Sequence, residues 1–360
     1  MKGRVLYAIL DWGLGHATRS IPIINLLLSE GYEVDLASSG DSLKLLRAEF
    51  RDLSIHELSS YDPEYQTGSG LAGKILLQLP KFLKAISTEH SEVKELHTRN
   101  HYSLIISDNR YGAYIEELPS ILICHQLTIP IDGKFGLLSP FIQSWHRRLM
   151  KPFDKIWVPD ISGSSSLGGK MTVYTGEFDI DYIGWLSRLE KTHDAERGEE
   201  ILFLISGPEP QRSLFEKELL EQAILHPQMT FNLVRGTSKE LQEPPTNVYA
   251  IGLANSEQIQ SLILSAKLIV CRSGYSSLMD LISLNKAAVL VPTPEMPEQQ
   301  YLAMNTAPKL GFKVARQGSI QLSEFLDKEI ELESVSNGFN SEAILKSLRE
   351  LTSAQTSALS

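Results

Sequence analysis

A buried strand followed by a glycine turn and a helix occurs near both ends of this chain. The first copy consists of the apolar segment 4–10 and the turn 13–16, and a helical pattern follows it. The second consists of the apolar segment 268–271 and the turn 272–275, again followed by a helix. Runs that are apolar throughout are typical of strands buried on both faces, and strands that alternate with helices form parallel sheets. The pattern predicts an α/β protein with two Rossmann-like, doubly wound parallel-sheet domains that face each other across a cleft.

The length of 360 residues also favours two domains, because it exceeds the size that one hydrophobic core usually supports. We assign the first Rossmann-like domain to residues 1–178, a linker to 179–199 and the second Rossmann-like domain to 200–340. A final helix at 341–358 is expected to complete the first domain. Besides the two copies above, we expect strands at 32–37, 104–107, 120–124, 155–158, 171–174, 201–205, 231–234, 248–251 and 288–291, and a helix at 212–223.

The overall composition narrows the class of protein. The formal net charge of −10 argues against a nucleic-acid-binding protein, which normally carries a basic excess. Cys124 and Cys271 lie far apart in apolar runs, which favours buried, reduced thiols. We expect a cytoplasmic protein, since neither a signal-peptide pattern nor an apolar run of transmembrane length is visible.

The first glycine turn contains a candidate catalytic base. Gly13 and Gly15 allow the backbone to approach a ligand closely, and His16 follows them at the start of a helix. Asp108 ends the apolar strand 104–107 and is expected at the same sheet edge. A carboxylate beside an imidazole fixes its tautomer, so the pair could remove a proton from a hydroxyl group. The alternatives are a tight turn with a surface histidine, and a helix-capping role for Asp108.

The second half of the chain contains groups suited to a nucleotide diphosphate and a sugar. The backbone N–H groups of the turn 272–275 lie at a helix start, where an anion is favoured, and Ser273 could add a hydroxyl donor. Asp280, within the helix, could accept from ribose hydroxyls, although an exposed helical acid is the simpler alternative. After a proline-rich loop, Glu298, Gln299 and Gln300 open another helix, and their polar groups could reach sugar hydroxyls.

Together these motifs resemble those of glycosyltransferases of the two-Rossmann (GT-B) fold. The similarity is strongest to the peptidoglycan N-acetylglucosaminyltransferases that form lipid II and to related UDP-sugar transferases. It rests on Cys271-Arg272-Ser273-Gly274, the acid at Asp280, the proline loop and Gln299-Gln300, which match the donor site of that family in order and spacing. The resemblance implies roles for these positions: diphosphate binding for Arg272, Ser273 and Gly274; ribose and sugar binding for Asp280, Glu298, Gln299 and Gln300; and an acceptor-side loop containing Gly13, Gly15, His16 and Arg19.

The chain also departs from that family. The loop after the strand 201–205 reads Ser206-Gly207-Pro208 in place of a Gly-Gly-Ser type loop, so we assign phosphate contacts there to Gly207 and Arg212. The ribose acid is aspartate where the family has glutamate. The segment 251–253 corresponds to the place where the nucleotide base stacks, which implies base contacts from Ile251 and Leu253.

The sequence therefore predicts an inverting, metal-independent glycosyltransferase that moves a sugar from a nucleotide-diphosphate donor, expected to be a UDP-sugar, to a hydroxyl acceptor. No cofactor is expected, and the Asp-x-Asp string at 179–181 is discounted as a metal site because it does not follow a donor-site strand. A lipid-linked, cell-envelope acceptor would bring the protein to the inner face of the membrane. The segments 74–84 and 141–153 mix apolar and basic residues as membrane-surface helices do, although we prefer core helices for both.

Two other functions fit the same residues. The string Gly-x-Gly-His-x-x-Arg, which ends at Arg19, also resembles nucleotide-sugar hydrolases of sialic-acid-like sugar pathways, in which water replaces the acceptor. A non-catalytic nucleotide-sugar binding protein is the third alternative, against which the presence of both His16 and Asp108 argues.

Overall fold

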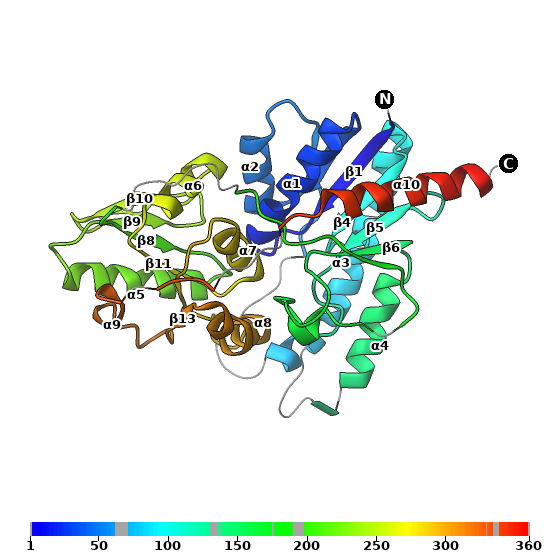
Figure 1. The fold of residues 1–360 in the computed structure, drawn as a ribbon. Helices are drawn as coiled ribbons and strands as arrows, with labels where there is room; N and C mark the ends of the chain where they lie inside the picture. The colour runs from blue at the N-terminus through cyan, green and yellow to red at the C-terminus, as the bar shows by residue number, and fades with distance from the viewer. Residues whose placement is uncertain are drawn as a thin grey trace.

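The computed structural model describes residues 2–61, 71–129, 136–137, 139–174, 176–189, 198–328, 330–333 and 338–358. Two separate parallel sheets, each with its own helices, form the two halves of the molecule (Figure 1). The predicted two-domain Rossmann-like architecture is confirmed. The side chains of 71–77 and 352–358 lie outside the described part, and so do those of the first four residues of the candidate membrane segment 74–84.

The first domain is built on a sheet whose described strands have the order β3-β2-β1-β4-β5-β6-β7. Each of their pairings is parallel. The elements in chain order are β1 (Arg4–Ile9), α1 (Gly15–Ser29), β2 (Glu33–Ser38), α2 (Gly40–Glu49), β3 (Ile55–Glu57), α3 (Leu71–Asn100), β4 (Leu104–Asp108), β5 (Ser120–Ile123), α4 (Ser139–Met150), β6 (Lys155–Val158), η2 (Gly169–Met171) and β7 (Ile180–Tyr182).

The second domain repeats this plan on a sheet with the order β10-β9-β8-β11-β12-β13 among the described strands. These pairings are also parallel. Its elements are β8 (Ile201–Leu204), α5 (Gln211–Leu225), β9 (Phe231–Val234), β10 (Val248–Ile251), α6 (Ser256–Ser265), β11 (Leu268–Cys271), α7 (Tyr275–Ser283), β12 (Val289–Leu290), α8 (Pro297–Tyr301), η3 (Leu302–Thr306), η4 (Ala307–Leu310), β13 (Lys313–Val314) and α9 (Ser323–Leu326).

In each sheet the strand order reverses direction beside the first strand of the domain. β1 lies between β2 and β4, and β8 lies between β9 and β11. Open parallel sheets bind ligands outside the carboxyl ends of the strands at such a switch point. The turn after β1 and the end of β4 flank the first switch point, and the turns after β8 and β11 flank the second. The fold therefore brings together the segments that the sequence analysis selected.

The two domains are packed against each other through α1 and α7. Ile24 and Leu27 of α1 belong to the same buried cluster as Leu278 and Met279 of α7. Burial of apolar surface is the main favourable contribution to such packing. The interface holds the start of α1 close to the start of α7.

The chain returns to the first domain at its end. The helix α10 (Ser341–Ala358) lies across the first domain in Figure 1, on the same side as both termini. The indole N–H of Trp157 donates a hydrogen bond of 2.7 Å to Ser347 Oγ, and Lys155 lies 2.9 Å from a Glu350 carboxylate oxygen. Ile344 and Leu348 of α10 are buried. These contacts make α10 part of the first domain.

The structure differs from the sequence prediction at the end of the first domain. Residues 171–174 do not form a strand; Met171 ends the short helix η2. The first residues assigned to the linker instead include β7, which pairs with β6, so the first sheet extends to Tyr182. Asp179 and Asp181 form ion pairs with Lys155 at 3.2 and 3.0 Å, which accounts for the Asp-x-Asp string.

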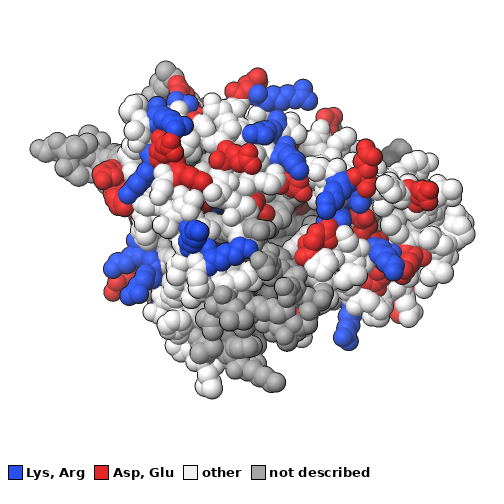
Figure 2. Space-filling model, turned by 180° about the vertical axis from the view of Figure 1, so that it is seen from behind, with Lys and Arg blue, Asp and Glu red and all other residues white. Residues whose placement is uncertain are grey.

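Within the described residues, no helix is both long enough and apolar enough to cross a membrane. The face of the molecule seen in Figure 2 carries acidic and basic side chains mingled with one another.

Candidate functional site

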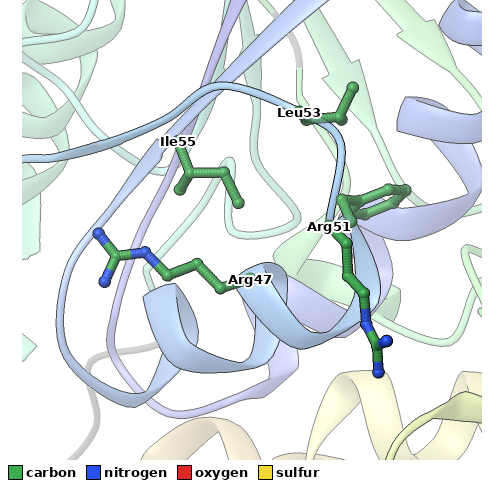
Figure 3. A pocket seen from close by; sticks show the side chains of 5 residues that line it. Arg47, Arg51, Leu53 and Ile55 are labelled. Atoms are coloured by element: carbon green, nitrogen blue, oxygen red, sulfur yellow. The ribbon is translucent and has the colours of Figure 1, made fainter.

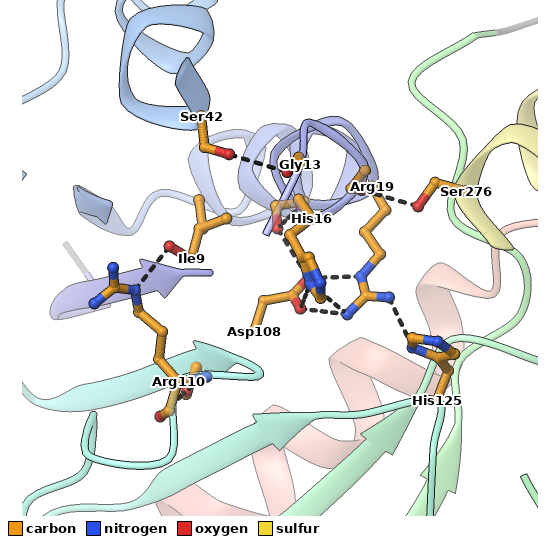
Figure 4. Close-up of polar contacts among 12 residues, drawn as sticks. Ile9, Gly13, His16, Arg19, Ser42, Asp108, Arg110, His125 and Ser276 are labelled. Atoms are coloured by element: carbon orange, nitrogen blue, oxygen red, sulfur yellow. Dashed lines mark hydrogen bonds and ion pairs between the residues drawn. The ribbon is translucent and has the colours of Figure 1, made fainter. Parts of the chain in front are cut away.

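His16 and Asp108 meet at the first switch point. His16 is the second residue of α1, and Asp108 is the last residue of β4, where it is in register with Ile9 of β1. The His16 Nδ1 atom lies 2.7 Å from Asp108 Oδ1 (Figure 4). The Asp108 side chain is fully buried, whereas the His16 side chain retains 13% of its exposure. The structure thus places together two residues that are 92 positions apart in the sequence.

The contact between His16 and Asp108 fixes the imidazole tautomer. A nitrogen and a carboxylate oxygen at 2.7 Å need a proton between them. Asp108 is ionised, because Arg19 and His16 together outweigh the effect of burial and lower the pKa of its carboxyl well below the usual range. Arg19 Nη2 also lies 3.0 Å from His16 Nδ1, but the contact with the anionic carboxylate is shorter and its oxygen can only accept, so the proton resides on His16 Nδ1. The neutral ring keeps its lone pair on Nε2, which is the atom that can accept a proton from a substrate hydroxyl.

Arg19 makes the site a triad of charged and polar groups. It lies one helical turn after His16 on α1, so both side chains project from the same face. Its Nε donates a hydrogen bond of 2.7 Å to Asp108 Oδ2, and its Nη2 donates to Oδ1. Ser20 adds a hydroxyl donor 3.3 Å from Asp108 Oδ2. The sequence analysis placed Arg19 in an acceptor-side loop; the structure gives it a buried, forked contact with the proposed dyad.

The electrostatic surroundings keep His16 neutral. Burial lowers the pKa of His16, the positive charge of Arg19 lowers it further, and the opposing effect of Asp108 does not fully compensate. An imidazole with a lowered pKa is available as a base at neutral pH. Because its pKa is lowered, His16 is a weaker base than the histidine of an isolated histidine–aspartate pair.

His125 and Glu298 extend this network into the second domain, and the sequence analysis missed His125. His125 follows β5, whose carboxyl end lies at the same sheet edge as that of β4. Arg19 Nη1 lies 3.0 Å from His125 Nδ1, and His125 Nε2 lies 3.3 Å from Glu298 Oε1 of α8. The position of His125 directly beyond a buried strand, as with Asp108, was the signal that could have found it.

The two glycine turns meet across the domain boundary. Ser276 of α7 donates a hydrogen bond of 2.9 Å to the carbonyl oxygen of Gly15 (Figure 4). Gly13 has a φ of +83°, a conformation that favours glycine, and accepts a hydrogen bond from Ser42 at its carbonyl oxygen. The starts of α1 and α7 therefore face one region, and the positive ends of both helix dipoles are directed towards it.

The side chains of the second turn are used inside the protein. Arg272 is fully buried, its guanidinium lies over the Phe215 ring, and it donates to the carbonyl oxygens of Val291 and Gln211. Burial lowers the pKa of Arg272 to about 10. The Ser273 hydroxyl donates to the backbone of Gln299. The prediction that these two side chains bind a diphosphate is corrected: they hold the turn in place, and only its backbone N–H groups at Gly274 and the start of α7 suit an anion.

The three residues that open α8 have separate roles. Gln299 is buried, and its Oε1 accepts a hydrogen bond of 2.8 Å from the backbone N–H of Thr293, which fixes the proline loop. Glu298 contacts His125 and also accepts from Gln126, both in the first domain. Gln300 is exposed. In this arrangement only Gln300 is free to contact a sugar, so the structure does not support a paired-glutamine contact or a sugar contact from Glu298.

Asp280 lies where the chain passes between the domains. Ser187 donates a hydrogen bond of 2.6 Å to Asp280 Oδ1. Burial raises the pKa of Asp280, while the nearby Arg188 and the Ser187 hydroxyl act in the opposite direction. The structure thus shows a contact with the interdomain segment, and the ribose role of Asp280 stays a prediction.

Arg212 is hydrogen-bonded inside the second domain. Its guanidinium donates to Glu209 and Glu216 and to the carbonyl oxygen of Arg235, and the side chain is buried. Arg235 forms a second pair with Glu216 at 2.9 Å. The expectation that Arg212 binds the diphosphate is therefore wrong for this conformation, because its donors are taken up by internal acceptors.

The remaining predicted donor contacts lie at the carboxyl edge of the second sheet. Gly207 follows β8 with a φ of +103°, so its backbone adopts a conformation that suits glycine. Ile251 ends β10, and Leu253 follows two residues later; both are half-buried. Their roles in diphosphate and base binding stay predictions.

The candidate membrane segment 141–153 is mostly α4. Of the described residues in that helix, only His146 and Met150 are buried. Phe141 retains 61% of its exposure, and Arg147 and Arg148 are exposed. Our preference for a core helix is therefore wrong for most of α4.

Two further observations delimit the site. Among the residues that the structure describes, no group of His, Cys, Asp and Glu side chains has the arrangement of a metal site. A surface pocket beside the end of α2 is lined by two arginines and three apolar residues (Figure 3). Its lining contains none of the predicted site residues: it consists of Arg47, Phe50, Arg51, Leu53 and Ile55.

Comparisons with known proteins identify relatives of the chain and of its second domain. Residues 203–344 match the glycosyltransferase family 28 C-terminal domain. An uncharacterized glycosyltransferase of Methanosarcina acetivorans is 23% identical over 334 residues, covering 82% of this chain and 81% of the relative.

Solved structures share the fold. The glycotransferase of kitacinnamycin has a TM-score of 0.62 at 16% identity, covering 98% of this chain and 95% of its own. MurG of Acinetobacter baumannii has a TM-score of 0.50 at 14% identity, covering 90% and 88% of the two chains. The protein has the GT-B glycosyltransferase fold. Its second domain matches family 28, and this match supports sugar transfer as its reaction class.

Proposed function

We propose that this protein is an inverting glycosyltransferase that moves a sugar from a nucleotide-diphosphate donor to a hydroxyl acceptor. The observation that carries the proposal is the 2.7 Å contact between His16 Nδ1 and Asp108 Oδ1 at the switch point of the first sheet. It leaves Nε2 as the proton acceptor, at the start of α1 and close to the start of α7. A base beside a diphosphate-binding helix start is the arrangement that group transfer requires.

In the proposed reaction, His16 Nε2 takes the proton of the acceptor hydroxyl as its oxygen attacks the anomeric carbon. The bond from that carbon to the diphosphate oxygen breaks, and the diphosphate leaves with the bond electrons. Attack from the side opposite the leaving group inverts the anomeric configuration. Backbone N–H groups at Gly274 and Tyr275, with the dipole of α7, stabilise the negative charge that develops on the diphosphate. We propose that this stabilisation takes the place of a metal ion.

For the donor we propose a UDP-sugar, in line with the family resemblance of the second glycine turn. Ligand binding raises the thermal stability of the state that binds. A thermal-shift series with uridine and thymidine diphosphate sugars therefore tests the donor class. No stabilisation by any nucleotide sugar would contradict the proposal.

The acceptor is tested through turnover. With a stabilising donor and candidate hydroxyl acceptors, we expect sugar transfer that His16→Ala abolishes while donor binding is kept. Stoichiometric release of free sugar without an acceptor would assign the hydrolase instead. Donor binding without turnover under either condition would indicate a binding protein.

We propose a lipid-linked acceptor and a peripheral membrane contact through α4. The support is the exposure of Phe141 beside Arg147 and Arg148, a combination that suits an anionic bilayer surface. Leu137, just before the helix, retains 95% of its exposure. Such a contact would place the first domain, with His16, at the inner face of the cell membrane.

A further inference from the structure

His125 lies between one partner in each domain, Arg19 and Glu298. Arginine can only donate, so the 3.0 Å contact from Arg19 Nη1 requires His125 Nδ1 to accept. The hydrogen of the neutral ring is then on Nε2, which faces Glu298 Oε1 at 3.3 Å. His125 thus accepts a hydrogen bond from the first domain, and its Nε2 faces Glu298 of the second domain in an ion-pair contact without hydrogen-bond geometry.

Elements of the second domain hold the His125 ring on two sides. The ring is stacked on Tyr275 of α7 with centroids 4.5 Å apart and an interplanar angle of 28°. Tyr275 is itself anchored by a hydrogen bond from its hydroxyl to the carbonyl oxygen of Pro159. Glu298 of α8 is held by Gln126 as well as by His125. The position of His125 therefore depends on α7 and α8.

Arg19 transmits that position to the base. Its Nη1 points to His125, while its Nε and Nη2 form the fork with Asp108. The guanidinium is planar and rigid, so a rotation that breaks one contact disturbs the others. Asp108 in turn determines the orientation and tautomer of His16.

We propose that His125 is a positioning residue for His16, which acts through Arg19 and Asp108, and that Glu298 anchors it from the second domain. The inference rests on the proposed role of His16 as the base. Its consequence is that the base is correctly oriented only while α8 is in place against the first domain. The binding of a donor to the second domain is thereby coupled to the acceptor side.

Several titratable and charged groups surround His16 and Arg19. His16 is influenced by Arg19, Asp108, His125 and Glu298. Cys124, Tyr7, Tyr111 and Tyr275 are further titratable groups that interact with Arg19. Burial opposes the charge of Glu298, but His125, Arg19 and His16 outweigh it and lower the pKa of Glu298. The negative charge of Glu298 favours the protonated form of His16.

Two substitutions of His125 separate positioning from packing. In His125→Asn the amide oxygen can replace Nδ1 as the acceptor for Arg19, but the ring is lost. In His125→Phe the ring can still stack on Tyr275, but both nitrogens are lost. We expect kcat to fall about 10- to 100-fold in His125→Phe and only a few-fold in His125→Asn, with the donor KM within about two-fold of the wild type. A larger loss in His125→Asn, or normal kcat in His125→Phe, would overturn the proposal.

A second measurement needs no turnover. The titration of His16 is followed by NMR in protein with labelled histidine, and its signal is assigned with His16→Ala. Glu298→Gln keeps an acceptor for His125 but removes the negative charge, so we expect the pKa of His16 to fall by about a few tenths of a unit. Glu324→Gln, at an exposed acid of α9, is the matched control and should leave the titration unchanged. An unchanged His16 titration in Glu298→Gln would overturn the coupling.

The kinetic measurements and the NMR titration together distinguish a failure of this inference from a failure of the proposed function. Absence of sugar transfer by the wild type would defeat the proposed function, and the NMR arm would still decide the coupling. Loss of transfer in His16→Ala together with normal transfer and titration in both His125→Phe and Glu298→Gln would defeat the inference alone.

Discussion

Ser276 in the second domain donates a hydrogen bond of 2.9 Å to the carbonyl oxygen of Gly15 in the first. A Cβ atom on Gly15 would lie only 3.0 Å from the same Ser276 Oγ. The two helix starts can therefore approach this closely because residue 15 has no side chain. The contact joins the glycine turns of the two domains and sets the distance between the proposed base and the diphosphate-binding turn.

Gly15→Ala should disturb this junction through Ser276. The hydroxyl must move to admit the Cβ, and the lost hydrogen bond is expected to cost about 1 kcal/mol in the free energy of unfolding. In Ser276→Ala the bond is already absent and more space is present, so Gly15→Ala should add little to it. Chemical denaturation of the two single variants and the double variant forms the test. If the losses in the free energy of unfolding of the two single variants add up fully in the double variant, Ser276 does not restrict the space for a side chain at residue 15.

Asp108→Asn should impair both turnover and folding. The amide cannot hold the Nδ1–H tautomer of His16 as an anion does, so we expect kcat to fall about 10²- to 10⁴-fold. The buried guanidinium of Arg19 loses its counter-charge, and the free energy of unfolding should fall by about 3–5 kcal/mol. Asp179→Asn, at an exposed acid of the same domain, is the control. Kinetics are measured well below the melting temperature, and normal turnover there would reject the dyad.

Activity should persist to lower pH than a typical histidine base allows. The base must be neutral, and the pKa of His16 is lowered by burial and Arg19, so the acidic limb of kcat/KM should lie below the usual value of about 6.5. A pH–rate profile of the wild type measures it. An acidic limb at or above pH 6.5 would contradict the described surroundings of His16.

Folding stability should fall in two steps as the pH is lowered. The folded pKa of His16 is below its unfolded value, so the unfolded state binds the extra proton first and stability declines below about pH 6.5. The lowered pKa of Asp108 contributes stability that is present above the unfolded value of about 3.9 and is lost as the pH falls towards the folded one. Urea denaturation between pH 3 and pH 8 measures both. His16→Gln should remove only the loss of stability below about pH 6.5. If this loss persists in the variant, it arises from another group.

Arg212→Met should affect stability and leave donor binding nearly unchanged. Arg212 is buried against Glu216, and its removal leaves that carboxylate with Arg235 as its remaining partner. We expect the free energy of unfolding to fall by about 2–4 kcal/mol, below the cost of a fully unpaired buried charge. Calorimetry with the stabilising nucleotide sugar measures the affinity. A loss of affinity greater than about ten-fold in a folded variant would restore the predicted phosphate contact.

Phe141→Ser and Arg147→Glu should weaken the binding of the protein to anionic vesicles. The first removes exposed apolar surface, and the second reverses a charge on the same helix. Co-sedimentation with phosphatidylglycerol-containing vesicles is compared with neutral phosphatidylcholine vesicles. Leu225→Ser removes an equally exposed apolar residue of the second domain and is the control. Equal sedimentation of all variants, or none of the wild type, would remove α4 as the contact.

Local sequence patterns were sufficient to predict most of the strands. The predicted bounds of β6, β9, β10 and β11 agree with the structure residue for residue. β6 and β11 are fully buried, and such parallel strands are short, mostly apolar runs. The strand β7 was missed, since Ile180–Tyr182 alternates with charge and is stabilised by pairing with β6 at the sheet edge. The segment 171–174 has a strand-like composition but no neighbouring strand to pair with in the described part of the chain.

The first-domain part of the site could be predicted and the second-domain part largely could not. His16 follows a glycine turn and Asp108 ends a strand, so the parallel-sheet rule alone brings them to one edge. The partners of Arg272 and Glu298 come from other elements, whereas Arg212 pairs with Glu216 of its own helix and with Glu209 just before it. A polar residue at the right spacing is equally suited to a ligand or to an internal acceptor, and packing decides which one it contacts.

The sequence by itself determined two doubly wound domains, the location of both glycine turns and the pair His16–Asp108. These follow from apolar runs and helix starts, whose physics is local to a few residues. Only the tertiary structure decided that Arg19 clamps Asp108, that His125 joins it to Glu298, and that Arg212 and Arg272 face inward. The contacts of Arg19, His125 and Arg272 link residues at least 19 positions apart, and chain geometry over such separations is set by how the sheets and helices pack.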